Sequence, residues 1–206
     1  MKRLIIALMA LVMMAPVYAA NDNGLTKSQQ KELNKKVKEF KKGKWSVMGT
    51  RTLDGALEAH YVKLNQLGED GREVMGVATK TKSKNTGLMM AKNNAVNNYA
   101  SDAASNLQAR LVADLQANGV ETDAEFEHFY AAFERLVETE INGEILPSLT
   151  LIRTNPDGTY EVNCYCIVSE SAASKARIRA AENALKESEA AQKYADKIAG
   201  FVREGF

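Results

Sequence analysis

The sequence predicts an α+β fold, in which a mainly antiparallel sheet of about four strands carries long alanine-rich helices packed on one face. Three observations lead to this prediction. Two alanine-rich stretches, residues 86–118 and 171–199, contain no proline and follow strand-like segments. Residues 144–168 have the pattern of a β-hairpin with a strong turn sequence at its centre. Small side chains on a helix allow a close approach to another backbone, so both helices are expected to lie on one sheet.

The first twenty residues are predicted to be a signal peptide of bacterial type. Lys2 and Arg3 give a basic start, and the apolar run 4–14 that follows is too short to span a bilayer comfortably. A small-x-small pattern then predicts cleavage after Ala19 or Ala20. Because no cysteine stands at the cleavage region, lipid attachment is not supported. We therefore expect the mature protein to be periplasmic or secreted.

Removal of residues 1–20 leaves residues 21–206, which is enough chain for a single α+β domain with a real core. Without Lys2 and Arg3, the mature chain has 25 basic and 26 acidic residues, a net charge of 25 − 26 = −1. This balance gives no basic excess to attract nucleic acid or an anionic membrane, so neither partner is expected. No other apolar run approaches the length that stable membrane insertion needs.

Hydrophobic periodicity and turn residues place the elements along the chain. Helices are predicted over residues 26–42, 52–67, 86–118, 123–140 and 171–199, and strands over 45–50, 73–82, 144–153 and 159–168. The first helix begins at a capping-box sequence, Thr26 with Gln29 three residues later. The last two strands flank the Asn-Pro-Asp-Gly turn at 155–158. In the strand before the long helix, Gly76 and Ala78 are small, which suits a closely packed helix.

Lysines cover most of the predicted helix 26–42. They form either a solvated helix face or a basic patch, and the interruption of the run by Glu32 and Glu39 favours the solvated face. The residues concerned are Lys31, Lys35, Lys36, Lys38, Lys41, Lys42 and Lys44.

The two cysteines, Cys164 and Cys166, lie two residues apart in the strand predicted over 159–168. Side chains two apart on a strand point the same way, with Cα atoms near the upper limit for a disulfide. This geometry favours two buried free thiols, so no disulfide is expected. A strained, redox-active disulfide and metal ligation stay open as alternatives.

Two groups of side chains are candidates for binding. A run of amides on the helix 86–118 could form a binding surface, although satisfaction by solvent or by a neighbouring turn is favoured. Its members are Asn93, Asn94, Asn97 and Asn98. An aromatic cluster on the helix 123–140 could line a small-ligand pocket against the sheet, although helical spacing favours core packing. Its members are Phe126, Phe129, Tyr130 and Phe133.

The sequence motifs of common catalytic and cofactor sites are missing. No metal site is predicted, because two histidines, His60 and His128, are too few and Glu125 with His128 gives only half of a di-iron pattern. Phosphate-binding, dinucleotide-binding and nucleophile-elbow motifs do not occur either. Carboxylates are scattered, so no pair stands out as an acid and a base. We therefore expect no cofactor and no catalytic residue, and the sequence favours a non-enzymatic protein.

A strand and a helix in the segment 73–199 share a residue pattern with a known family. The matching positions are Gly158, Tyr160 and Val162 in the strand and Ala91, Ala95 and Ala100 in the helix. On these residues the chain resembles the uncharacterised secreted or lipid-anchored envelope proteins of the lipoprotein-20 type, which pack an alanine-rich helix on an antiparallel sheet. The resemblance implies a location and a fold but no catalytic residue. The chain lacks the lipobox cysteine of the lipid-anchored members, which argues against anchoring.

The sequence favours an exported, non-enzymatic envelope or secreted protein that acts through a surface, in a structural, adhesive or assembly role. An envelope protein is the expected partner, and the oligomeric state is left open. The first alternative is a small-ligand-binding module that uses the apolar, aromatic-lined pocket. A hydrolase with an unrecognised site is the less favoured alternative.

Overall fold

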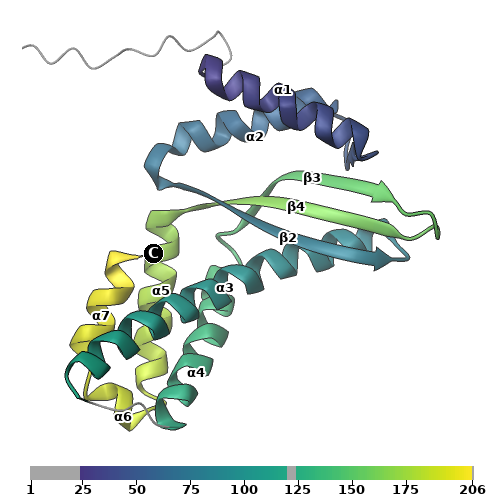
Figure 1. The fold of residues 1–206 in the computed structure, drawn as a ribbon. Helices are drawn as coiled ribbons and strands as arrows, with labels where there is room; N and C mark the ends of the chain where they lie inside the picture. The colour runs from purple at the N-terminus through teal and green to yellow at the C-terminus, as the bar shows by residue number, and fades with distance from the viewer. Residues whose placement is uncertain (1–23, 120–123, 206) are drawn as a thin grey trace, which may run out of the picture.

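The fold is an antiparallel sheet with helices on both faces and a helical bundle beside one end of it (Figure 1). The computed structural model describes residues 24–119 and 124–205. The predicted signal peptide and its cleavage at Ala19 or Ala20 therefore lie outside the described residues. In chain order the elements are α1 (Lys27–Lys42), β1 (Ser46–Val47), α2 (Leu53–Leu67), η1 (Gly68–Asp70), β2 (Gly71–Thr81), α3 (Lys84–Ala117), α4 (Ala124–Ile141), β3 (Leu146–Thr154), β4 (Tyr160–Ser169), α5 (Glu170–Leu185), α6 (Glu189–Gln192) and α7 (Ala195–Glu204).

The sheet has the strand order β1-β3-β4-β2, and all neighbouring strands are antiparallel. The predicted hairpin is confirmed as β3 and β4, and the Gly158 N–H donates to the Asn155 carbonyl at 3.0 Å within its turn. Gly158 has a φ of +80°, a left-handed value that glycine adopts without strain. β1 is two residues long, shorter than the predicted strand 45–50, and the chain leaves the sheet through Gly49. β1 and β2 are the two edge strands.

α3 packs across β2 and β4 on one face of the sheet, as the small residues predicted (Figure 1). It begins before the predicted residue 86, because the Ser83 side chain caps its first turn. The contact is closest at Gly76 in β2, where a Cβ atom would lie 2.0 Å from the Ala91 carbonyl oxygen and 2.3 Å from the Ala95 nitrogen. Backbone therefore meets backbone at this point. The apolar face of β4 is buried against α3, and its buried members are Val162, Cys164, Cys166 and Val168.

α1 and α2 cover the opposite face of the sheet (Figure 1). The capping box at the start of α1 is confirmed, because the Thr26 hydroxyl accepts from the Gln29 N–H and the Gln29 side chain accepts from the Thr26 N–H. A second and smaller hydrophobic cluster joins this layer to the sheet. It contains Leu25, Leu33, Val37, Ala56, Leu57, Leu149 and Leu151. The molecule thus has two hydrophobic cores, one on each side of the sheet.

The helical bundle contains α4, α5, α6, α7 and the second half of α3 (Figure 1). The prediction of one continuous helix over 171–199 is wrong, because that segment is divided among α5, α6 and α7. The chain breaks at Ser188, whose side chain accepts a hydrogen bond from the Ala191 N–H and caps α6. The break allows α7 to fold back against α5 and bury Ile198 completely. Small apolar residues suit a straight or a broken helix equally, so the pattern could not reveal the break.

The predicted fold class is confirmed: the protein is α+β, with a four-stranded antiparallel sheet and a long alanine-rich helix on one face. The second alanine-rich helix, α5, continues directly from β4 and packs mainly on α4 and α7. The sequence had not predicted the helical layer on the other face of the sheet.

Candidate functional site

The candidate functional site is a row of lysines on the solvent side of α1, here named the lysine face: Lys27, Lys31, Lys35 and Lys38. Burial of Leu33 and Val37 against α2 and the sheet sets the rotation of the helix, so the lysines must point outward. Together with intervening side chains they line a shallow hollow of about 790 Å³. These side chains are Ser28, Gln30, Glu32 and Asn34.

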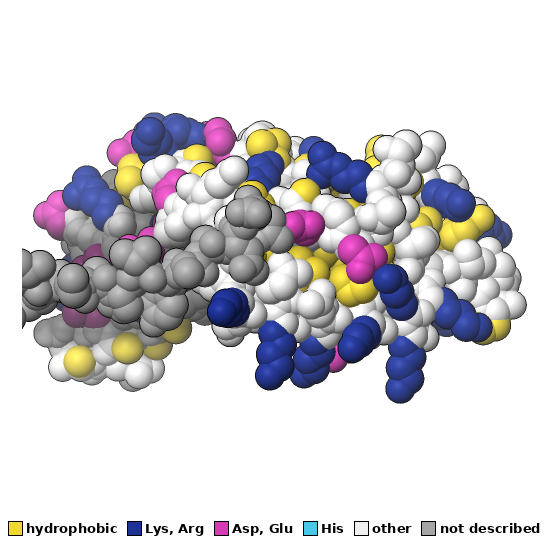
Figure 2. Space-filling view, turned by 90° about the horizontal axis from the view of Figure 1, so that it is seen from above, with side chains coloured by type: hydrophobic (Ala, Val, Ile, Leu, Met, Phe, Trp, Pro, Cys, Tyr) yellow, Lys and Arg dark blue, Asp and Glu magenta, His cyan; other side chains and the backbone are white. Residues whose placement is uncertain are grey.

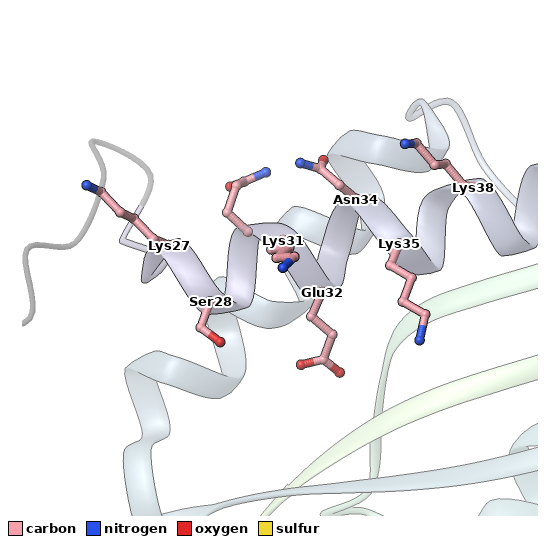
Figure 3. Close-up of a pocket in the computed structure, with 8 residues that line it drawn as sticks. Lys27, Ser28, Lys31, Glu32, Asn34, Lys35 and Lys38 are labelled. Carbon is pink, nitrogen blue, oxygen red and sulfur yellow. The ribbon is translucent and has the colours of Figure 1, made fainter.

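The side chains of the lysine face spread around this hollow (Figure 3). Those of Lys27 and Lys38 extend on one side, that of Lys35 on the other, and that of Lys31 projects between them. All four lysines are exposed. Lys35 lies 4.0 Å from Glu39 in an exposed pair one helical turn away, and such a pair contributes little to stability. Within the described residues, Lys27, Lys31 and Lys38 have no acidic partner.

Charge is divided unequally between the two parts of the chain. Residues 24–92, which form α1, α2, β1, β2 and the start of α3, contain 15 Lys and Arg against 7 Asp and Glu. Residues 93–206, which include the helical bundle, contain 10 Lys and Arg against 18 Asp and Glu. The net charges are therefore +8 and −8. Lys and Arg side chains project from the face that α1 covers (Figure 2). Because the two net charges cancel, the total charge of the chain does not reveal that positive and negative residues lie in different segments.

A hydrogen bond between the buried His60 and the more exposed Glu73 fastens α2 to the sheet. His60 in α2 is 2% exposed, and its Nε2 lies 2.5 Å from Oε2 of Glu73 in β2. The hydrogen bond with His60 lowers the pKa of the Glu73 carboxyl, since it stabilises the charged form. The rings of Tyr61 and Tyr165 pack edge-on against His60. Because His60 is closed to solvent, this pair is a structural anchor and is poorly placed to meet a substrate.

A second buried polar cluster joins the sheet end of α5 to α3. Arg177 is 1% exposed, and its two terminal nitrogens donate to the Tyr99 hydroxyl and to Oε1 of Glu170, each at 2.5 Å. Burial raises the pKa of Tyr99 above its usual value. A hollow of about 330 Å³ beside this cluster is lined by both signs of charge, including Arg72 and Asp102. The cluster holds the bundle against the sheet and presents no single-charge surface.

Two of the four predicted surface asparagines close the edge of the sheet. The Asn94 amide donates to the Val77 carbonyl at 2.7 Å, and the Asn98 amide donates to the Met75 carbonyl at 3.0 Å. Both carbonyls belong to the edge strand β2, where they would otherwise lack a strand partner. The remaining members, Asn93 and Asn97, are exposed on the same helix.

The predicted aromatic cluster lies in the main hydrophobic core. α4 packs on α3 and α5, and all four rings are at most 4% exposed. They are Phe126, Phe129, Tyr130 and Phe133. Burial raises the pKa of Tyr130 to about 12, and its hydroxyl has no hydrogen-bond partner among the described residues. A ligand could reach these rings only if α4 moved.

Metal ligation and membrane insertion find no support in the described part of the chain. No group of three or more His, Cys, Asp or Glu side chains there could hold a metal ion. No helix in the same ranges combines the length and the apolar character needed to cross a bilayer.

The chain matches no protein family, no curated protein and no solved structure in the comparisons made. The resemblance to the lipoprotein-20 type therefore stays a prediction. The sequence predicted a solvated surface for Lys31, Lys35 and Lys38, which are most of the lysine face. It did not predict the hydrogen bond between His60 and Glu73. A count of charge by chain segment could have indicated the lysine face. No local sequence pattern could have indicated the contact between His60 and Glu73, because the two residues lie on different elements.

Proposed function

We propose that this chain is an exported, non-enzymatic protein that acts through a surface, and that the lysine face of α1 binds a polymer with repeated anionic groups. The observation that carries the proposal is the unbroken spacing of Lys27, Lys31, Lys35 and Lys38 along one exposed helix. At about 1.5 Å per residue, the row is roughly 16 Å long. A row of that length can contact several successive charges of an acidic polysaccharide or a phosphate polymer.

The acidic bundle does not cancel the lysine face. The sheet separates α1 from the bundle, and each packed layer adds about 10 Å. This distance exceeds the screening length of about 8 Å at physiological salt. The local charge at α1 therefore governs binding, although the whole mature chain is nearly neutral.

The composition of the lysine face supports a polyanion more than a folded protein partner. Energetically important contacts between proteins use buried aromatic and arginine side chains, and the hollow on α1 is lined by neither. The envelope protein expected from the sequence remains a second candidate, because Met89 and Met90 are 67% and 45% exposed on α3. The aromatic-lined ligand module receives no support, because its four rings are buried.

The test is binding of the purified chain to a sulfated polysaccharide such as heparin, used as a general polyanion probe, over a range of salt concentrations. The variant Lys31→Glu/Lys35→Glu/Lys38→Glu should bind at least tenfold more weakly at low salt. Its log affinity should also depend less steeply on log salt, by roughly two to three units of slope, because fewer counterions are released.

The matched control carries the same change in charge on the bundle. Lys175, Lys186 and Lys193 are exposed there, and their triple replacement by Glu should leave binding within about twofold. An equal loss of affinity in both triple variants would contradict the assignment of the lysine face as the binding site. Export is tested separately, by N-terminal sequencing of the protein recovered from the cell envelope. Its first residue should be Ala20 or Asn21. Retention of the uncleaved chain in the cytoplasm would overturn that part of the proposal.

A further inference from the structure

Cys164 and Cys166 lie side by side on β4, under α3, on the sheet face opposite the lysine face. Both are fully buried, and their Sγ atoms are 3.5 Å apart. The Thr150 hydroxyl on the neighbouring strand donates to the Cys164 Sγ at 3.8 Å. The Cys164 sulfur therefore has two polar neighbours: the Thr150 hydroxyl, which donates to it, and the Cys166 thiol, with which either sulfur can act as the donor.

This arrangement makes the two thiols chemically different. The hydrogen bond with Cys166, followed by that from Thr150 and the charge of Lys92, lowers the pKa of Cys164 below its ordinary value. The same shared proton and burial raise the pKa of Cys166. A thiolate at Cys164 thus keeps a protonated neighbour within reach, which is the arrangement of an attacking thiol and a resolving thiol.

Thr150 connects this buried pair to a hollow in the surface. Thr150 is half-buried, and with Met48, Pro147 and Ser148 it lines a hollow of about 300 Å³ beside β1 and β3. Thr150 therefore both lines the hollow and donates a hydrogen bond to the buried Cys164 sulfur. Of the two thiols, Cys164 is the one that accepts a hydrogen bond from a residue lining the hollow.

We propose that Cys164 and Cys166 are an oxidisable dithiol, which a small-molecule disulfide converts into a disulfide within β4. The Cys164 thiolate attacks one sulfur of the oxidant, whose S–S bond breaks and releases one thiolate. Cys166 then gives its proton to that thiolate and attacks the Cys164 sulfur, which releases the second external thiolate. This thiolate takes up from solvent the proton that Cys164 had lost. Two protein thiols are oxidised to one disulfide, and one external disulfide is reduced to two thiols. The sequence predicts export, and exported thiols meet such oxidants.

Oxidation should loosen the contact between α3 and the sheet. Cα atoms two apart on a strand are separated by about 6.6 Å, near the upper limit for a disulfide, so closure requires β4 to bend. The strand paired with β4 cannot follow freely, because Gly76 opposite Cys164 already meets the α3 backbone. The oxidised protein should therefore unfold at a temperature lower than the reduced protein by about 2 °C or more.

The experiment starts from the reduced chain, which is exposed to oxidised glutathione at pH 7, quenched with acid, alkylated and mapped by mass spectrometry. The peptide that contains both cysteines should lose two hydrogens and resist alkylation. Cys166→Ser should accumulate glutathione on Cys164. Cys164→Ser should react at least roughly tenfold more slowly, since its remaining thiol is protonated. In the Cys166→Ser background, Thr150→Val should slow the reaction several-fold, whereas Thr79→Val on β2 should not.

Three results would overturn the inference. The first is a native chain whose thiols stay reduced under conditions that oxidise the same chain in urea, which would make them inert core residues. The second is equal reactivity of the two single-cysteine variants, which would contradict the assignment of Cys164 as the attacking thiol. The third is a disulfide that leaves the thermal midpoint unchanged or raises it. The outcome is independent of polyanion binding, because the dithiol and α1 lie on opposite faces of the sheet.

Discussion

Gly76 shows how one residue decides the spacing of two layers. Its missing side chain lets the α3 backbone rest on β2, with the Ala91 and Ala95 backbone atoms at the contact. A glycine in a strand weakens that strand locally by its conformational entropy. Here the close approach buries a long run of alanines, which have little side-chain entropy to lose. The small residue is therefore required by packing on this face.

Replacement of this glycine should test the contact directly. We expect Gly76→Ala to lower the free energy of unfolding by about 2 kcal/mol or more, because the added Cβ forces two backbones apart. Urea unfolding followed by circular dichroism would measure the loss. The matched control is Gly200→Ala in α7, where nothing lies within 4 Å of the added atom. That change should be neutral or stabilising, because alanine favours a helix. Equal destabilisation by both changes would contradict this explanation of Gly76.

The edge of the sheet shows how a helix protects a strand. β2 is an edge strand, and edges that expose unpaired backbone groups invite pairing with other chains. Asn94 and Asn98 project from α3 one helical turn apart and occupy two outward carbonyls of β2. Their spacing of four residues on the helix matches the two-residue spacing of outward carbonyls on the strand. The poor helix propensity of asparagine is thus offset by hydrogen bonds to the strand.

Removal of one of these amides should destabilise the protein and expose a backbone carbonyl of the edge strand β2. We expect Asn94→Ala to reduce the free energy of unfolding by about 1 kcal/mol, since a partly buried carbonyl loses its donor. Light scattering during prolonged incubation should also show faster aggregation. Asn93→Ala, on the exposed side of the same helix, is the control and should stay within about 0.5 kcal/mol of the parent. If Asn93→Ala behaved like Asn94→Ala, helix propensity would explain the asparagine run better than the edge contacts.

At the scale of the whole molecule, the sheet divides two hydrophobic cores of unequal size. The larger core joins α3, α4, α5 and α7 to one face, and the smaller core joins α1 and α2 to the other. Units with fewer buried contacts tend to open at lower free energy than the main core. The His60–Glu73 hydrogen bond is one of the fastenings of the smaller layer. The lysine face therefore lies on the layer that is expected to open first.

Acid should release this layer before the rest of the protein. Because His60 lowers the pKa of Glu73 in the folded state, the carboxylate stabilises the fold at neutral pH. That contribution is lost as the pH falls below the ordinary carboxyl pKa of about 4.3 and then through the lower pKa that Glu73 has in the folded state. Trp45, the single tryptophan, packs against the smaller core and reports on it. Near pH 3, urea unfolding followed by Trp45 fluorescence should precede unfolding followed by circular dichroism.

The variant Glu73→Gln should produce the same early fluorescence transition at pH 7. The difference between this variant and the parent should then shrink as the pH falls, because the parent also loses its carboxylate. Glu144→Gln, at an exposed carboxyl in the turn before β3, is the control and should leave both transitions coincident. Coincident transitions for Glu73→Gln at every pH would show that His60 and Glu73 do not fasten the layer separately.

The sequence by itself determined the features that depend on neighbouring residues. The Thr26 capping box, the hairpin turn at 155–158 and the long alanine-rich helix are written in residues a few positions apart. The apolar face of β4 and the smallness of Gly76 also follow from local pattern, and together they give the fold class. These signals are local because backbone hydrogen bonds, caps and turns form between near neighbours in the chain.

Only the tertiary structure decided how distant residues meet. It placed α1 and α2 on the second face of the sheet, broke the last helix at Ser188 and brought His60 to Glu73. It also placed the Cys164 and Cys166 sulfurs 3.5 Å apart and gave Asn94 a strand carbonyl as partner. Each of these outcomes depends on which surfaces bury one another, and an apolar pattern specifies that a surface is buried without specifying its partner. The lysine face became a candidate site for the same reason, because burial of the opposite side of α1 turned its lysines toward solvent.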